Sequence, residues 1–195
     1  MLAKPVAPTL LILLVLIALF AVSSGACTER KQTNKNATPV LSGPPSTAFP
    51  MPPLNARPEL GWVLSDGSRV RLADHHGKVL VLDFYATWCE PCRKSIPRLI
   101  ALQNKYDAKD LLVVGLNVGG PDDRIKVSSF AKELGIQYPL GFPDQALSNL
   151  FLSDNQTIPQ TFIFGRDGEP QKRFIGYDAE DELEKAIDGA VNSKR

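Results

Sequence analysis

The sequence predicts an α/β domain in which helices cover both faces of a mixed central β-sheet, with a β-hairpin extension at its N-terminal side. Residues 79–84 and 111–117 are apolar at nearly every position, as expected of strands buried on both faces. Segments with one apolar stripe at helical spacing follow both runs. Strands and helices that alternate in this way, with a hairpin at each end of the series, form one sheet between two helical layers.

Composition indicates one domain with appendages. The chain has 195 residues, with 22 basic and 21 acidic side chains, so no strongly charged partner is implied and we expect no nucleic-acid binding. We expect the domain over residues 59–195. Two appendages precede it, over residues 1–27 and 28–58.

The first appendage has the layout of a secretory signal. Lys4 precedes an unbroken apolar run over residues 10–22, and four small residues follow the run. Counted through Ala26, the run approaches the length that spans a bilayer, so an uncleaved membrane anchor stays open as an alternative. Cys27, directly after Ala26, resembles the acylated cysteine of a bacterial lipoprotein box, although Ser24 stands where leucine is usual. The other interpretation is a signal-region cysteine without a role.

The second appendage predicts a tether. Residues 28–58 are polar at first and then rich in proline, and they show neither helical nor strand periodicity. Proline-rich segments of this kind are semi-extended spacers. Such a spacer would let a membrane-attached domain reach substrates at some distance from the surface.

The domain begins with a hairpin and a loop. Residues 62–64 and 70–72 alternate in character around a turn at residues 66–67, which predicts two antiparallel strands. His75 and His76 follow in a loop. Adjacent side chains on an extended backbone point to opposite sides, so we expect both histidines to be solvated rather than to share a site.

Asp83 interrupts the first buried strand. A carboxylate at such a position is costly unless it is paired or neutral. Its position six residues before Cys89 therefore requires an explanation. The alternative is a carboxylate that faces solvent from the edge of the strand.

Cys89 and Cys92 lie where this strand leads into a helix. The first thiol of such a pair stands at the helix start, where free backbone N–H groups and the helix dipole stabilise a thiolate. The second is close enough to close a ring with the first, which lets it resolve a mixed disulfide. Pro91 fits the first turn because the missing N–H costs nothing there.

Two other uses of the cysteine pair are weaker. A zinc site needs two further ligands at matching spacing, and only His75, His76 and Cys27 are available. A purely structural disulfide would close too small a loop to constrain the unfolded chain. We therefore expect no metal, and no cofactor besides a redox-active Cys89–Cys92 disulfide.

The rest of the domain follows from periodicity and turn residues. We expect these elements in order: a helix to Tyr106 with a kink at Pro97, a strand at 111–117, a helix at 122–134 ended by Gly135, a strand-like segment and short helix over 138–151, a hairpin of 161–164 and 171–175, and a last helix with Asp178 as N-cap.

Residues 81–92 resemble the active-site strand and helix start of thioredoxin-like proteins, and are most similar to the membrane-tethered TlpA/ResA type. Residues 157–161 resemble the second hallmark of that fold, a loop whose proline, here Pro159, is cis and faces the cysteines. The resemblance covers roughly residues 60–191 and implies a thioredoxin fold. Residues 118–158 look longer than in minimal thioredoxins, and inserted loops near a site tend to set partner choice.

The resemblance also implies an activity, that of an extracytoplasmic, membrane-anchored thiol-disulfide oxidoreductase acting on protein disulfides. Cys89 would attack, Cys92 would resolve, and Asp83 would lie beneath the disulfide and handle the proton of Cys92. ResA-type relatives instead tend to place an acid three residues after the second cysteine, where this chain has Ser95. Substrate contacts are implied at Trp88, Glu90, Pro91, Ile158, Pro159 and Gln160.

The direction of the reaction depends on the thiolate. Glu90 places a negative charge beside Cys89 and disfavours its thiolate, which favours a reductase over an oxidant. Arg93 and Lys94 partly offset that charge. The resemblance implies a membrane thiol-transfer protein as electron donor and, as one possible substrate class, apocytochrome c cysteines awaiting haem.

Two other functional classes remain as alternatives. A thiol peroxidase with antioxidant activity would have Thr or Ser three residues before its nucleophile, where this chain has Ala86. A non-catalytic interaction module or copper carrier of this fold would not need Trp88-Cys89 together with Pro159. An isomerase is weaker still, since nothing predicts dimerisation and we expect a monomer.

Overall fold

The computed structural model describes residues 51–177 and 180–193, all within one compact unit. The predicted signal or anchor over residues 1–27, Cys27, the tether up to residue 50 and the Asp178 cap lie outside the described residues. Within the described part of the chain, no helix is both long and apolar enough to cross a membrane.

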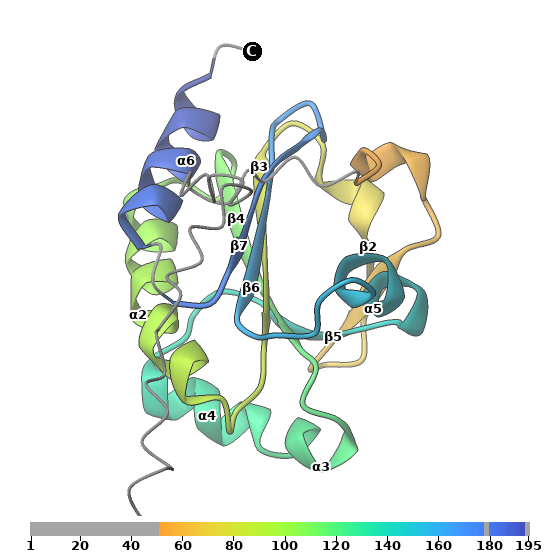
Figure 1. The fold of residues 1–195 in the computed structure, drawn as a ribbon, viewed down its shortest axis with the longest axis vertical. Helices are drawn as coiled ribbons and strands as arrows, with labels where there is room; N and C mark the ends of the chain where they lie inside the picture. The colour runs from red at the N-terminus through yellow and green to blue at the C-terminus, as the bar shows by residue number, and fades with distance from the viewer. Residues whose placement is uncertain (1–50, 178–179, 194–195) are drawn as a thin grey trace, which may run out of the picture. The chain divides into compact units, whose positions relative to one another are not determined.

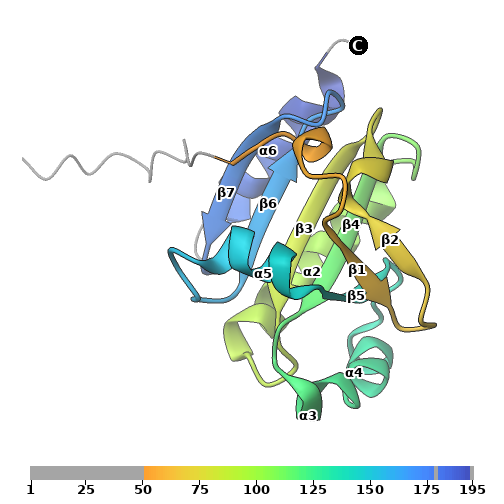
Figure 2. The ribbon, with the colours of Figure 1, turned by 90° about the vertical axis from the view of Figure 1, so that its right-hand side faces the viewer.

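One seven-stranded sheet runs through the domain in the order β2-β1-β5-β4-β3-β6-β7. β3, β4 and β5 are parallel neighbours, whereas β6, β7 and the β1–β2 hairpin join antiparallel. The predicted mixed sheet and both hairpins are thereby confirmed (Figures 1 and 2). The strands are β1 (Gly61–Leu64), β2 (Arg69–Arg71), β3 (Val79–Tyr85), β4 (Leu111–Asn117), β5 (Leu140–Pro143), β6 (Gln160–Phe164) and β7 (Pro170–Ile175).

Helices cover both faces of the sheet. Figure 1 shows α2, α4 and α6 on one side, and α5 on the other. The helices are α2 (Glu90–Lys105), α3 (Pro121–Arg124), α4 (Val127–Leu134), α5 (Gln145–Leu152) and α6 (Glu180–Asn192), with short 3₁₀ helices η1 (Leu54–Ala56) and η2 (Leu72–His75). The arrangement is a thioredoxin fold with an N-terminal hairpin extension.

The two helical layers create two cores, and β3 alternates between them. Val79, Val81 and Tyr85 belong to the core beneath α2, α4 and α6. Leu80, Leu82 and Phe84 belong to the core beneath α5. By this alternation Asp83 faces the α2 side, which is the layer that carries the cysteines.

The helix predicted over residues 122–134 is wrong as a single element. The structure has α3 and α4, joined by a 3₁₀-type turn in which Lys126 N donates to Asp123 O at 3.0 Å. The Asp123 carboxylate accepts hydrogen bonds from Thr87 and Asn117. The Asp123 side chain points into the protein from α3. For this reason α3 does not continue the amphipathic pattern of α4.

The prediction that His75 is a solvated loop residue is also wrong. His75 ends η2, is partly buried, and stacks on Trp62 with ring centroids 5.3 Å apart. Burial, followed by the charge of Lys78, lowers the pKa of His75, which keeps the ring neutral. His76 is exposed as expected.

Packing on the domain begins before the predicted end of the tether at residue 58. Leu54 in η1 is fully buried in the α5-side core. Its N–H donates to the carbonyl of Gly168, in the β6–β7 turn, at 3.0 Å. An apolar side chain with a backbone anchor explains why this stretch is ordered although its composition resembles a linker.

Candidate active site

A disulfide joins Cys89 and Cys92 at the start of α2. Cys89 is the N-cap, and its sulfur accepts a hydrogen bond from the backbone N–H of Cys92 at 3.2 Å. Pro91 lies in the first turn, as predicted. Cys89 is 4% exposed and Cys92 is fully buried, so an incoming group reaches the first sulfur before the second.

The loop before β6 faces this disulfide, as the sequence predicts. The Ile158–Pro159 bond is cis, and the Ile158 carbonyl oxygen lies 3.7 Å from Cys89 Sγ. The carbonyl of Pro159 accepts a hydrogen bond from Gly176 N at 2.8 Å. The loop therefore presents backbone beside the first sulfur and is fixed from behind by the end of β7.

A buried polar brace supports the same loop. The fully buried Gln160 amide donates to the carbonyls of Asn155 and Thr157 at 2.7 and 2.8 Å. Its oxygen accepts from Arg173 Nε at 2.9 Å, and Arg173 pairs with Asp154 at 2.6 Å. The Gln160 side chain is thus engaged internally with the loop and with Arg173.

Asp83 is fully buried on the α2 side of β3. Its Oδ1 accepts a hydrogen bond from Thr161 Oγ1 at 3.0 Å, whereas Oδ2 has no hydrogen-bond partner among the described side chains. Burial raises the pKa of Asp83 to about 7, and the bond from Thr161 opposes this only in part. The alternative of a solvent-facing carboxylate at a strand edge is wrong.

Two tyrosines share the interior with Asp83. An added Cβ on Gly115, the register partner of Asp83 in β4, would meet the rings of both Tyr85 and Tyr138. Burial, and then the charge of Asp83, raises the pKa of each tyrosine. Both phenols therefore stay protonated, so neither tyrosine adds a negative charge when Asp83 ionises.

Asp123 holds the loop that leads into the cysteines. Its carboxylate accepts hydrogen bonds from the backbone N–H and the hydroxyl of Thr87, and from Asn117 Nδ2 at 2.7 Å. Burial opposes its charge, but these bonds outweigh burial and lower the pKa of Asp123. The sequence analysis missed this residue, because an acid in a surface helix gives no signal of a partner 36 residues away.

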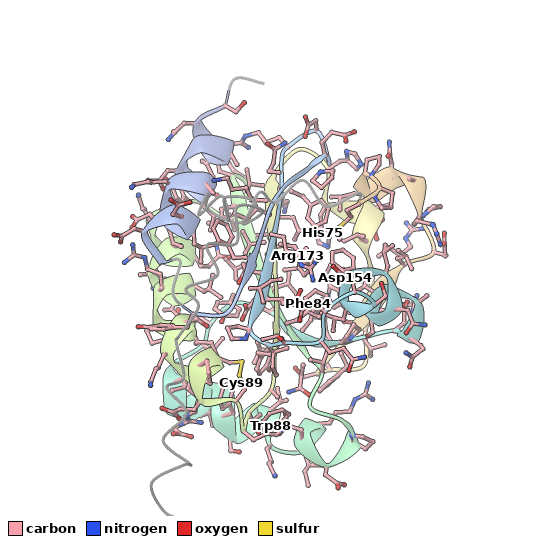
Figure 3. All side chains as sticks on the ribbon, viewed as in Figure 1. His75, Phe84, Trp88, Cys89, Asp154 and Arg173 are labelled. Carbon is pink, nitrogen blue, oxygen red and sulfur yellow. A yellow bond between two sulfur atoms is a disulfide. The ribbon has the colours of Figure 1, made fainter. Side chains whose placement is uncertain are left out.

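The predicted substrate contacts next to the cysteines lie on the surface. Trp88 is 65% exposed, and Glu90 and Pro91 are also exposed. Figure 3 shows Trp88 beside Cys89 at the end of the domain where α3 lies. Trp88 is thus a large apolar side chain that lies in solvent and directly precedes Cys89 in sequence.

The charges near Cys89 are largely compensated. Glu90 lies 3.9 Å from Lys94 along the exposed side of α2, and Arg93 pairs with Glu133 of α4. Among the described residues, no group of three or more His, Cys, Asp or Glu side chains is placed to hold a metal ion. The site is thus organised around the sulfur pair and the buried carboxyl.

Comparisons with known proteins agree with this geometry. A model of the AhpC/TSA family matches residues 52–172. The thiol-disulfide oxidoreductase ResA of Bacillus subtilis is 32% identical over 117 residues, 59% of this chain and 64% of that protein. ResA of Geobacillus kaustophilus is 29% identical over 131 residues, 65% of this chain and 72% of that one.

Solved structures give the same result. The crystal structure of a thiol:disulfide interchange protein of the thioredoxin family from Chlorobium tepidum has a TM-score of 0.61 and 26% identity, and covers 74% of this chain and 99% of its own. StoA of Bacillus subtilis, at 22% identity and a TM-score of 0.53, shares the fold, with 66% of this chain and 96% of that one covered.

Proposed function

Because the chain belongs to the AhpC/TSA family, we propose that it is a thiol-disulfide oxidoreductase that reduces protein disulfides outside the cytoplasm. The observation that supports this most directly is the Cys89–Cys92 disulfide at the start of α2, beside the cis Ile158–Pro159 bond. Relatives with the same activity in their names, the ResA proteins, align over most of the domain.

In the first step, the Cys89 thiolate attacks one sulfur of the substrate disulfide. A mixed disulfide forms, the substrate S–S bond breaks, and the leaving substrate thiolate takes a proton from solvent. The N–H of Cys92, which points at Cys89 Sγ, stabilises the attacking thiolate together with the helix dipole. Cys89 is 4% exposed and Cys92 is fully buried, so the substrate sulfur approaches Cys89 first.

In the second step, Cys92 attacks Cys89 Sγ and releases the second substrate thiol. The protein disulfide forms, and two electrons have passed from the dithiol to the substrate. Cys92 is fully buried, so its proton needs an internal acceptor. Asp83, whose pKa of about 7 matches this task, takes the proton as Cys92 attacks.

The substrate backbone lies along the Ile158–Pro159 loop, with Trp88, Glu90 and Pro91 as further contacts. The exposed Trp88 ring adds apolar area next to the reacting sulfur. Gln160 and Arg173 act as positioning residues, since their side chains are engaged with the loop and not with the surface.

We further propose that the protein acts as a monomer held at a membrane, through a lipid on Cys27 or an uncleaved anchor over residues 1–27. A membrane thiol-transfer protein would restore the dithiol, and apocytochrome c cysteines are one substrate class. Glu90 disfavours the thiolate, but its exposed pairing with Lys94 makes the effect small. The reduction potential of the Cys89–Cys92 pair, rather than the charge of Glu90, therefore sets the direction of the reaction.

The test uses the reduced full-length chain. We expect it to reduce a protein disulfide and to form one Cys89–Cys92 disulfide for each substrate disulfide that is reduced. We also expect its reduction potential, measured against glutathione, to lie on the reducing side. Hydrogen peroxide consumption that outpaces disulfide reduction would instead support the thiol peroxidase alternative. Metal that copurifies in stoichiometric amount would support the carrier alternative.

A further inference from the structure

We propose that a pocket beside the disulfide binds an acidic residue of the substrate polypeptide, close in sequence to the substrate cysteine, and that Arg124 selects it. This inference rests on the proposed function, because it concerns the substrate of the same site. It assigns a chemical role to α3 and α5, two of the helices within residues 118–158.

The pocket continues the surface around the reactive sulfur. It has a volume of about 520 Å³, and Trp88 and Ile158 form part of its wall. Trp88 precedes Cys89 in sequence, and the Ile158 carbonyl lies 3.7 Å from Cys89 Sγ. A chain joined to Cys89 in a mixed disulfide therefore lies at the edge of this pocket.

Arg124 is the charged residue among those that line the pocket. The others are apolar side chains, glycine and prolines, or neutral amides and hydroxyls. Two of the amides, Gln145 and Asn149, bond to each other at 2.8 Å. The pocket thus offers one full positive charge and no negative charge, which is complementary to a carboxylate.

The Arg124 guanidinium is held in place without a carboxylate partner. It stacks over the Phe142 ring at 4.4 Å from the centroid, which leaves the N–H groups on the edge of the plane free for an incoming group. Over residues 51–177 and 180–193, no carboxylate forms an ion pair with it. The neighbouring Asp123 carboxylate is turned inward to Thr87 and Asn117.

The apolar part of the wall indicates the rest of the occupant. Trp88, Leu152 and Ile158 can cover the aliphatic stem of a glutamate or an adjacent apolar side chain. A pocket of this volume suits one or two residues of an extended chain. Because such a chain advances about 3.3 Å per residue, the acidic residue would lie within about three positions of the substrate cysteine.

The experiment measures the rate at which the reduced full-length chain reduces ten-residue peptides, each closed by one internal disulfide. One series carries a single Glu at successive positions within three residues of either cysteine, and a matched series carries Gln there. For wild type we expect at least one Glu position to raise kcat/KM about three- to ten-fold over its Gln counterpart, mainly through KM, as a partly shielded ion pair does.

Arg124→Gln should remove this difference, lowering kcat/KM on the Glu peptides to the level of the Gln peptides, with a much smaller effect on the Gln peptides themselves. Arg124→Glu should favour Lys at the same peptide position. Lys132→Gln is the matched control, because it removes an equal charge from the exposed last turn of α4 without touching the pocket.

Equal rates on Glu and Gln peptides at every position would overturn the inference, as would an equal loss in Arg124→Gln and Lys132→Gln. Failure of the proposed function is distinguishable, since wild type would then reduce neither series.

Discussion

Asp83 and Thr161 face each other across β3 and β6, and the hydroxyl of Thr161 donates the one hydrogen bond that the Asp83 carboxyl receives within the described residues. A buried carboxyl with one oxygen bonded and one oxygen bare is better suited to carrying a proton than a charge. Burial raises the pKa of Asp83 from its ordinary value of 3.8 to about 7, and the single bond from Thr161 offsets only part of that rise.

Asp83→Asn should slow the resolving step. The variant keeps the shape and the Thr161 bond, but removes the group that would accept the Cys92 proton. We expect release of substrate from the mixed disulfide to be slower by about ten-fold or more at neutral pH. The deficit should shrink as pH rises and Cys92 ionises unaided, while the first attack by Cys89 changes little.

Stopped-flow reduction of a protein disulfide between pH 6 and pH 9 separates these two steps. Ser95→Ala is a useful control, because its hydroxyl is bonded to the Cys92 carbonyl and lies in the same helix turn. If Asp83→Asn and wild type resolve at one rate at every pH, the proton leaves to water and Asp83 has no role in it.

The same carboxyl should make stability depend on pH. The folded state holds the proton up to about pH 7, whereas the unfolded chain releases it near 3.8. The contribution of Asp83 to the free energy of unfolding is therefore largest below about pH 4. It falls as pH rises to about 7, by at most about 1.4 kcal/mol per pH unit. Asp83→Asn lacks this loss and should gain stability relative to wild type across that window.

Urea unfolding of the two oxidised proteins at pH 5, 6, 7 and 8 measures the difference. A difference in unfolding free energy that stays constant over this range would mean that Asp83 titrates at an ordinary pKa.

The two cysteines should behave differently when replaced singly. Cys92→Ser leaves an attacking thiol without its resolving partner, so mixed disulfides with substrates should accumulate. Cys89→Ser should trap nothing, because Cys92 is fully buried. Non-reducing gels with mass spectrometry of the adducts detect this. Equal trapping by both variants would contradict the assignment of Cys89 as the attacking thiol and Cys92 as the resolving thiol.

The brace behind the proline loop should contribute to stability. Arg173→Met leaves the buried Gln160 oxygen without this donor, and an unsatisfied buried acceptor costs about 1–3 kcal/mol. Lys172→Met, on the adjacent residue of β7, should cost less, since it loses one contact over the Phe174 ring. Chemical unfolding compares the two, and an equal loss would show that the brace adds nothing specific.

Membrane attachment gives a prediction outside the described residues. If Cys27 is acylated, Cys27→Ser should abolish acyl labelling and leave the protein either uncleaved or released from the membrane fraction. Mass spectrometry of the mature N-terminus decides this. An unmodified Cys27 in a chain cleaved elsewhere would contradict the lipoprotein interpretation and leave the plain signal or the anchor.

The parts of the site that the sequence predicts are those encoded locally. Cys89, Cys92 and Asp83 fall on one strand and one helix start that short-range rules identify. The Thr157-to-Thr161 segment is identified by its resemblance to the proline loop of thioredoxin-like proteins. Asp123 and Gln160 act through partners 36 and 13 residues away. Only the folded chain brings those partners together, because the pairing depends on strand order rather than on periodicity.

The same reason accounts for the two structural errors. The inward Asp123 carboxylate divides one expected helix into α3 and α4, and the Trp62 ring draws His75 out of solvent. Each is a single tertiary contact that outweighs a local pattern.

The Leu54–Gly168 hydrogen bond ties the incoming chain to the β6–β7 turn. That turn lies at the Val79 end of β3, whereas the disulfide follows the Tyr85 end, so the two are at opposite poles of the sheet (Figure 2). A force applied to the chain before Met51 would therefore enter the domain at Leu54. The length of the central strands separates that point from Cys89.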